Sequence, residues 1–358
     1  MLASTTTTTS NTLMMSCCFS SSSSSFSTKN RKNLSSSSSL MSSSTSSSVR
    51  IAVVGDIHDE WNFEDDSKAL RFLQPDFVLF TGDFGNENVE LVRSIAKLEI
   101  AKAVILGNHD CWNTQQFSEK RKDRVILQLE CLGEEHVGYR RLDFPSLKLT
   151  VVGGRPFSHG GETLFRKKLL SARYGVHDMQ GSAKRIYNSA IRTPEGHSVV
   201  FLAHNGPTGL GSKVNDICGK DWDFGGGDHG DPDLAKAISD LKETTQIAIP
   251  LVVFGHMHKQ LAYGNGMRKM IAVGEDNTVY LNGAIVPRVK IPTREQETST
   301  SMKESGSVCS PETNGTVRAF TLVEILDGKL QKITETWVFV MGDDTRLEEQ
   351  HILFETVT

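Results

Sequence analysis

Short apolar runs, rich in β-branched residues and each closed by Gly or a polar residue, recur along the chain from residue 50 onward. Runs of this kind are typical of strands that are buried within a sheet. They predict strands at residues 50–57, 77–82, 102–106, 148–153, 198–203 and 250–255.

Between these runs, apolar residues recur with the period of a helix. This pattern predicts helices at residues 89–97, 117–132, 162–174 and 233–241. The last of them has a start signal, because Asp231 is followed by Pro232 at the first helical position. Strands that alternate with helices indicate a layered α/β fold, in which functional residues lie in loops beyond the carboxyl ends of the strands.

The final part of the chain has a different pattern. Residues 292–315 are polar and charged without periodicity, which predicts a disordered loop. Residues 317–325 and 330–340 alternate apolar and polar positions on either side of an Asp327-Gly328 pair, and this pattern is typical of a β-hairpin. We expect the hairpin to join the main sheet system.

The beginning of the chain differs from the rest in composition. The first 50 residues contain 21 Ser, 8 Thr and four basic residues, with no acidic residue and no apolar core of a secretory signal. This composition resembles that of a plant chloroplast transit peptide. We therefore expect residues 1–48 to direct the chain to the chloroplast stroma and residues 49–358 to form the folded domain. An ordinary disordered tail is the alternative.

Charge and hydropathy argue against several classes of function. After residue 50 the chain has 35 basic and 43 acidic residues, so it lacks the positive charge that binding along a nucleic acid requires. No apolar stretch approaches the roughly 20 residues of a membrane-spanning helix. The cysteines have no C-x-x-C spacing, which indicates a reducing compartment. No pattern indicates an oligomeric state.

Five stretches place metal-compatible side chains directly after a predicted strand. These stretches are Gly55-Asp-Ile-His58, Gly82-Asp83, Gly107-Asn-His-Asp110, His204-Asn-Gly206 and Gly255-His-Met-His258. Each stretch is weak evidence when taken alone. A His at the end of a strand, for example, usually serves as an ordinary hydrogen-bonding residue. The order of all five, each after a β-type run, is much more specific.

This order resembles that of the calcineurin-like metallophosphoesterase superfamily, and the resemblance covers residues 50–258. It implies central β-sheets flanked by helices, in a sandwich of the α/β/β/α type. It also implies hydrolysis of a phosphoester by a hydroxide bound to two divalent ions. A mixed set of imidazole, carboxylate and amide donors suits Mn, Fe or Zn better than Mg or Ca.

The resemblance assigns roles to individual residues, beginning with the metal ligands. It implies that the first ion is held by Asp56, His58 and His258. It implies that the second ion is held by Asn108, His204 and His256, and that both ions are bridged by Asp83. By the same analogy, His109 donates a proton to the leaving group or stabilises the charged transition state, and Asp110 orients the His109 imidazole.

Departures from the family pattern bear on the substrate. Protein Ser/Thr phosphatases of the superfamily carry G-D-x-x-D-R-G, whereas this chain has Gly82-Asp-Phe-Gly-Asn-Glu-Asn88 without the Arg. We therefore expect a phosphodiester or phosphomonoester of a small molecule, with a protein Ser/Thr phosphatase as the alternative. A non-catalytic scaffold for protein partners is a second alternative, although every expected ligand position is filled.

Three further features are candidates for substrate contacts. Arg155 follows the run 148–153, so it could bind the substrate phosphate in place of the missing Arg. The Gly-rich region 205–232 could form a lid or a wall beside His204. Trp112 and Asn113 directly follow the third motif, where they could stack on a leaving group or hydrogen-bond to it.

Overall fold

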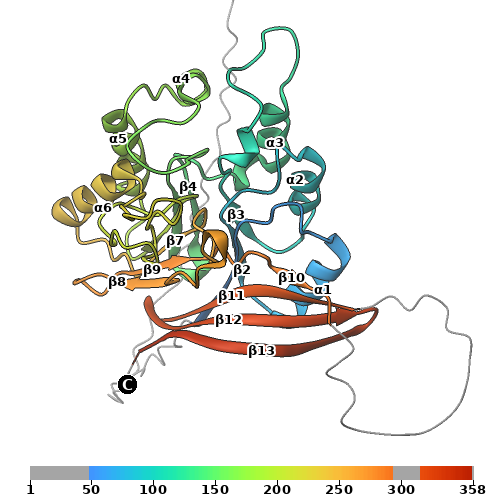
Figure 1. Ribbon diagram of the computed structural model, residues 1–358. Coiled ribbons are helices and arrows are strands. Elements are labelled where there is room, and N and C mark those ends of the chain that lie inside the picture. The colour runs from blue at the N-terminus through green and yellow to red at the C-terminus, as the bar shows by residue number, and fades with distance from the viewer. Residues whose placement is uncertain (1–47, 293–314, 357–358) are drawn as a thin grey trace, which may run out of the picture. The chain divides into compact units, whose positions relative to one another are not determined.

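Two β-sheets form the centre of the computed structural model, which describes residues 48–292 and 315–356 (Figure 1). Seven strands form the first sheet, in the order β13-β12-β11-β1-β2-β3, with β10 also paired to β11. Its strands are β1 (Ser48–Val54), β2 (Phe77–Phe80), β3 (Lys102–Val104), β10 (Val289–Lys290), β11 (Thr316–Leu326), β12 (Lys329–Met341) and β13 (Asp344–Glu355). Strands β1, β2 and β3 are parallel, so their carboxyl ends lie at one edge.

The second sheet has six strands in the order β4-β5-β6-β7-β9-β8. Its strands are β4 (Arg141–Phe144), β5 (Leu149–Gly153), β6 (Ser198–Leu202), β7 (Leu251–Phe254), β8 (Ile271–Val273) and β9 (Val279–Asn282). Strands β5, β6, β7 and β9 are parallel. All six predicted strands are therefore present, each within about two residues of its expected start, a margin that is usual for assigned boundaries.

Alternate residues of the buried strands face different layers. In β1, Ile51 and Val53 belong to a core cluster that also contains Val200 and Leu202 of β6, so this cluster lies between the two sheets. Their neighbours Ala52 and Val54 belong to the other large cluster, which contains the apolar residues of the helices. Because strand side chains alternate between faces, the result is the predicted sandwich of helices, two sheets and helices.

The helices lie on both sides of the strands, with α4, α5 and α6 on one side and α2 and α3 on the other (Figure 1). They are α1 (Phe63–Leu73), α2 (Val89–Ala96), α3 (Arg124–Leu132), α4 (Lys167–Tyr174), α5 (Met179–Ala190) and α6 (Pro232–Thr244). None of the described helices is long and apolar enough to cross a bilayer.

Two helices begin later than the sequence predicts, and two were not predicted. Helix α3 begins at Arg124 rather than at residue 117, because the carboxylate of Asp123 accepts a hydrogen bond from Ser118 N and closes a turn. Helix α4 begins at Lys167 rather than at residue 162. Helices α1 and α5 are rich in polar residues, which weakens the periodic signal on which the prediction depends.

The predicted hairpin is present as β11 and β12, and it pairs with β1 as expected. Strand β13 follows it but was not predicted, because most of its side chains are exposed and five of its twelve residues are charged. The expected transit peptide at residues 1–48 and the expected loop at 292–315 lie almost wholly outside the described residues.

Candidate metal centre

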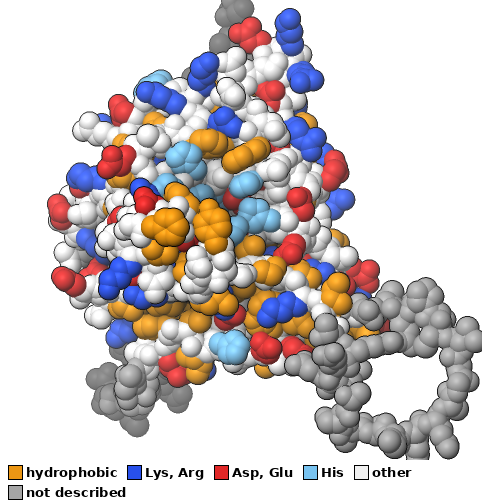
Figure 2. Space-filling view, in the orientation of Figure 1, with side chains coloured by type: hydrophobic (Ala, Val, Ile, Leu, Met, Phe, Trp, Pro, Cys, Tyr) orange, Lys and Arg blue, Asp and Glu red, His pale blue; other side chains and the backbone are white. Residues whose placement is uncertain are grey.

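The side chains that follow β1, β2, β3, β6 and β7 come together where these strands end. They form three overlapping groups of possible metal ligands, in which the ligand atoms lie within 4.8 Å of one another. The groups are Asp56 with His58 and His258, His58 with Asp83 and His109, and Asp83 with His204 and His256. Figure 2 shows histidine side chains gathered in the middle of this face of the molecule, with hydrophobic side chains beside them.

The first group joins the loop after β1 to the loop after β7. The Nε2 atoms of His58 and His258 are 3.0 Å apart, and His258 Nε2 lies 3.4 Å from Asp56 Oδ2. The other carboxylate oxygen of Asp56 accepts hydrogen bonds from His256 N at 3.0 Å and from the Thr81 hydroxyl at 3.4 Å. One oxygen of Asp56 therefore fixes the backbone, and the other faces the imidazoles.

Asp83 lies between this group and the next. Its Oδ2 atom is 3.9 Å from His58 Nε2, and its Oδ1 atom is 3.4 Å from His204 Nε2. The side-chain oxygen of Asn108 lies 2.9 Å from the same His204 nitrogen. The structure thus brings together all seven side chains that the sequence suggests as ligands.

The donor atoms of the cluster fit a pair of divalent cations. Asp56 Oδ2 is buried and has no hydrogen-bond partner. His204 Nδ1 donates to the Thr81 carbonyl at 2.7 Å, so in the neutral ring Nε2 is an acceptor, although it faces the acceptor oxygen of Asn108. Cations among these atoms would give Asp56 Oδ2 a partner and would separate the two acceptors, His204 Nε2 and the Asn108 oxygen. A ligating histidine usually donates its other ring N–H to a carbonyl or carboxylate, as His204 does to Thr81.

Buried negative charge dominates the electrostatics of the site. Burial alone would raise the pKa of Asp83, but the surrounding imidazoles, His204 above all, lower it. Burial alone would lower the pKa of His204, but the charge and hydrogen bond of Asp83 raise it to about 10. Burial and the adjacent His204 lower the pKa of His256 to about 3, and the charge of Asp83 only partly opposes them. The centre therefore attracts positive charge, and a metal cation can supply it in place of a proton.

The backbone of the motif loops is strained where it presents these side chains. Asp56, His58, Asp83 and His256 have φ angles of 46°, 44°, 52° and 68°, in the left-handed region that non-glycine residues rarely adopt. Each such residue costs about 1–2 kcal/mol, and strain of this kind is typical of functional sites. Gly107 permits the close approach, since a Cβ atom there would lie 2.3 Å from Asp83 Oδ1.

Residues 49–260, more than half of the chain, match the family model of calcineurin-like phosphoesterases. The chain belongs to this family.

Solved structures similar to this phosphoesterase include NAD nucleotidase from Haemophilus influenzae (10% identity, TM-score 0.41), a dimetal phosphatase from Danio rerio (8%, 0.40) and a purple acid phosphatase from yellow lupin seeds (12%, 0.38). Each similarity covers 86% of this chain, and it covers 50%, 99% and 54% of the three neighbours respectively. The chain thus spans about half the length of the nucleotidase. No curated protein matches the sequence significantly.

His109 lies at the edge of the cluster of this phosphoesterase. Its Nδ1 atom is 2.7 Å from the side-chain oxygen of Asn86, and its ring stacks on that of Trp112 at 4.7 Å between centroids and 7° between planes. Burial lowers its pKa, and Asp83 opposes that effect. Because His109 also forms one of the three groups with His58 and Asp83, geometry alone does not separate it from the metal ligands.

Asp110 does not orient His109, so that prediction is wrong. The buried Asp110 carboxylate accepts hydrogen bonds from the backbone N–H groups of Asp83, Phe84 and Gly107, at 2.9, 3.0 and 2.7 Å. Asn86 makes the contact to the His109 ring instead. Burial, together with the charge of Asp83, raises the pKa of Asp110 well above its usual value. Asp110 therefore ties the loop after β2 to the loop after β3.

Arg155 is enclosed within the protein, which argues against the expected contact with a substrate phosphate. Its side chain is fully buried, and its guanidinium donates to Asp231 at 2.7 Å and to Asp233 at 2.9 Å. Its remaining nitrogen donates to the Thr163 carbonyl at 3.3 Å. The strand-end position of Arg155 thus leads to an internal ion pair with the start of α6 rather than to the cluster.

Sequence reasoning missed two polar residues that support the site, Asn86 and Glu87. The buried Glu87 accepts hydrogen bonds from the backbone N–H groups of Asn113 and Thr114, at 2.8 and 2.6 Å, and so fixes the chain after the third motif. The signal was present, because both residues follow Asp83 closely in the polar run that ends at Asn88.

The Gly-rich region 205–232 does lie against the cluster. His229 packs on His256 with ring centroids 6.0 Å apart, and its Nε2 atom lies 2.7 Å from the carbonyl of His159. The backbone of Gly161 in turn donates to the His229 carbonyl at 3.0 Å. This part of the region is therefore tied to the loop after β5.

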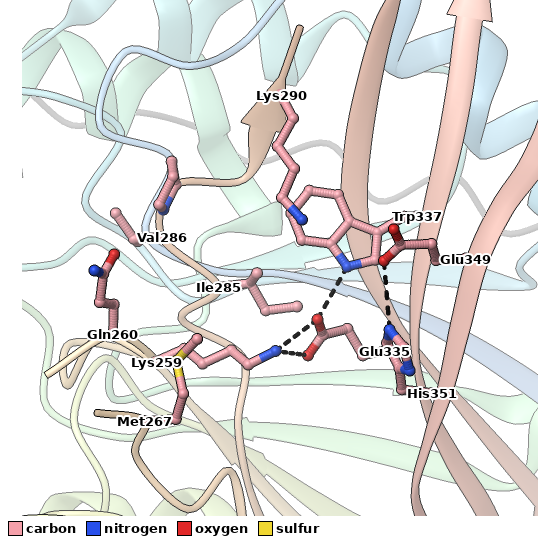
Figure 3. A pocket seen from close by; sticks show the side chains of 11 residues that line it. Lys259, Gln260, Met267, Ile285, Val286, Lys290, Glu335, Trp337, Glu349 and His351 are labelled. Carbon is pink, nitrogen blue, oxygen red and sulfur yellow. Dashed lines mark hydrogen bonds and ion pairs between the residues drawn. The ribbon is translucent and has the colours of Figure 1, made fainter. Parts of the chain in front are cut away.

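A separate cavity of about 340 Å³ lies beside the residue that follows His258 (Figure 3). In its lining, Lys259 contacts both oxygens of Glu335, at 2.6 and 2.7 Å, and Trp337 Nε1 donates to Glu335 at 3.0 Å. Lys290 Nζ lies 3.5 Å from the centre of the Trp337 ring. These contacts anchor the segment that carries His258 to β12.

Proposed function

We propose that this protein is a dinuclear metal phosphoesterase that hydrolyses a phosphodiester or phosphomonoester of a small molecule. The observation that carries the proposal is the convergence of the five strand-end motifs on one cluster, with Asp83 shared between two of its groups. Family membership supports a hydrolase that acts on phosphoric ester bonds. The mixed nitrogen and oxygen donors favour Mn, Fe or Zn.

The ligands divide into two sets around Asp83. In the proposed arrangement one cation is held by Asp56, His58 and His258, and the other is held by Asn108, His204 and His256. Two divalent ions held there would supply a nucleophile at neutral pH and would withdraw charge from the phosphoryl oxygens. The left-handed backbone at four of these positions keeps the ligand atoms in place before substrate binds.

His109 is the proposed partner of the leaving group. Its contact with Asn86 places the proton of the neutral ring on Nδ1, so Nε2 is free to accept a further proton. An anionic substrate beside the ring would raise the pKa that burial lowers, and the charged ring can then donate the Nε2 proton to the leaving oxygen. The stacked Trp112 and the hydrogen bond to Asn86 hold the ring in one orientation.

We also propose that the protein acts in the chloroplast. The support for this is the Ser- and Thr-rich, acid-free composition at the start of the chain.

Metal content and turnover of two variants test the catalytic proposal. The full chain with Mn²⁺ is assayed with bis-p-nitrophenyl phosphate and with p-nitrophenyl phosphate, and bound metal is measured by elemental analysis. We expect Asp83→Ala to lose metal and nearly all turnover. We expect His109→Ala to keep its metal and to turn over about 100-fold more slowly, which is the scale of a lost general acid. His177→Ala is the matched control, because this exposed ring lies outside the cluster and its side chain hydrogen-bonds to Ser171.

Two results would contradict parts of this proposal. If His109→Ala loses metal as severely as Asp83→Ala, then His109 is a ligand and not the proton donor. If the unaltered protein binds two ions but hydrolyses neither ester, then the scaffold alternative is favoured.

A further inference from the structure

A cavity of about 240 Å³ opens directly beside the metal centre. It is lined by two of the proposed ligands, His256 and His258, together with Trp222, Gln260 and Arg268 among others. This volume is below the range of about 300–1,000 Å³ that is usual for sites that hold a whole drug-sized ligand. The cavity can therefore accommodate one substituent of an ester whose phosphate lies at the metal centre.

Trp222 supplies an aromatic surface to this cavity. Its side chain is 50% exposed, which is unusual for a residue of this size. Its ring meets that of His229 edge to face, with centroids 4.8 Å apart, and His229 packs in turn on His256. A continuous set of rings thus runs from the metal centre to the rim of the cavity.

The chain around Trp222 is fixed rather than loose. The preceding Asp221 accepts a hydrogen bond from Ala262 N at 2.9 Å and forms an ion pair with Arg268 at 3.0 Å. The buried Arg268 guanidinium also donates to the carbonyls of Gly219 and His258, at 2.7 and 3.0 Å. Arg268 therefore joins Gly219 and Asp221, just before Trp222, directly to the backbone of a proposed ligand.

The rest of the lining distinguishes between kinds of substituent. The side-chain amide of Gln260 offers both a donor and an acceptor at the wall of the cavity. Asp221 adds a carboxylate to the lining, while Met257 adds apolar surface. A flat ring with polar edges matches an indole face beside the Gln260 amide, whereas an alkyl chain would make no hydrogen bond with that amide.

We propose that Trp222 is a stacking platform for a planar heterocyclic ring, such as a nucleobase, on the substrate of this enzyme. This inference rests on the proposed function, because it places the phosphoester of the same molecule at the metal centre. Stacking of a base on an aromatic side chain typically changes affinity by about 5- to 150-fold. The ring would therefore contribute substantially to the choice of substrate.

The test compares two ligands, of which one carries a heterocyclic base and the other does not. Hydrolysis-resistant phosphonate analogues of adenosine 5′-phosphate and ribose 5-phosphate are titrated into the full Mn²⁺-loaded protein by calorimetry. We expect the adenosine analogue to bind about tenfold more tightly. Trp222→Ala should bring the two dissociation constants to within about twofold, and Trp222→Phe should keep most of the difference, because a phenyl ring still stacks.

Phe224→Ala is the matched control, because Phe224 is a fully exposed aromatic residue two positions away that does not line the cavity. It should leave the ratio of the two constants unchanged. Equal affinity for the two ligands in the unaltered protein would overturn the proposal, and so would a ratio that survives Trp222→Ala. A protein that hydrolyses no phosphoester but shows the Trp222-dependent ratio would disprove the proposed function and leave the stacking platform standing.

Discussion

Replacing Arg155 with alanine is expected to destabilise the folded protein rather than to weaken substrate binding. The guanidinium forms ion pairs with Asp231 and Asp233, and all three side chains are at most 1% exposed. Alanine leaves both carboxylates buried without their cation. An uncompensated charge in such a place is costly, because neither water nor another positive group can reach it.

The expected loss can be estimated from similar buried pairs. Removal of one partner from a buried ion pair typically costs about 3–5 kcal/mol. The total stability of a domain is only about 5–15 kcal/mol, so the variant would lose a large part of it. At roughly 2 °C per kcal/mol for a domain of this size, the melting temperature should fall by about 6–10 °C.

The loss should also depend on pH. Burial raises the pKa of Asp231 to about 7, although Arg155 acts to lower it. Between the unfolded value near 3.9 and this value, the folded protein retains a proton that the unfolded chain releases, so stability falls as the pH rises through that window. Without Arg155 the pKa rises further and the window extends upward. The variant should therefore be more strongly destabilised at pH 8 than at pH 5.

Calorimetric melting of the full chain at both pH values, together with KM for a phosphoester, separates the two roles of Arg155. Arg140→Ala is the matched control, because that arginine pairs with Glu134 on the surface, where an ion pair contributes about 0–1 kcal/mol. A several-fold higher KM with an unchanged melting temperature would refute the structural reasoning. It would restore the role of Arg155 as a phosphate contact.

Two further predictions concern the metal centre and the start of the chain. Asp110→Ala removes the acceptor of three backbone N–H groups, and we expect Mn²⁺ affinity to fall about 10- to 100-fold in a chelator competition assay. Cys131→Ala, in α3, is the control and should leave the affinity unchanged. Unchanged affinity in the Asp110 variant would show that the two loops hold their positions without it. A fluorescent fusion of residues 1–60 should accumulate in chloroplasts of plant cells, and fluorescence that stays in the cytosol would disprove the import proposal.

The strands and the metal ligands could be predicted from the sequence because both depend on local signals. A buried parallel strand is a short apolar run, and its carboxyl end brings the next few residues to a shared edge. Asp83 follows β2 and His204 follows β6, so their placement required only the strands. Helices α1 and α5 carry more polar residues, and their buried faces were correspondingly difficult to recognise.

Residues behind the ligands could not be predicted, because their roles depend on contacts between distant parts of the chain. Arg155 and Asp110 both stand beside strand ends, as the ligands do. Their partners are set by tertiary packing: Asp231 is 76 residues from Arg155, and Asp83 is 27 residues from Asp110. The sequence predicts the edge of the sheet at which a residue lies, but it does not predict the partner that its side chain contacts.

Asp231 shows how these contacts connect stability to the site. Its position before Pro232 indicated the start of α6, and the helix does begin there, yet its side chain makes no capping hydrogen bond. The carboxylate instead accepts from Arg155, from Ser158 at 2.7 Å and from Asn205 at 3.2 Å. Since Asn205 directly follows His204, the buried ion pair also supports a proposed metal ligand. Loss of Arg155 should therefore lower the affinity for metal only indirectly, through a looser Asn205. The free energy of metal binding should change less than the free energy of unfolding.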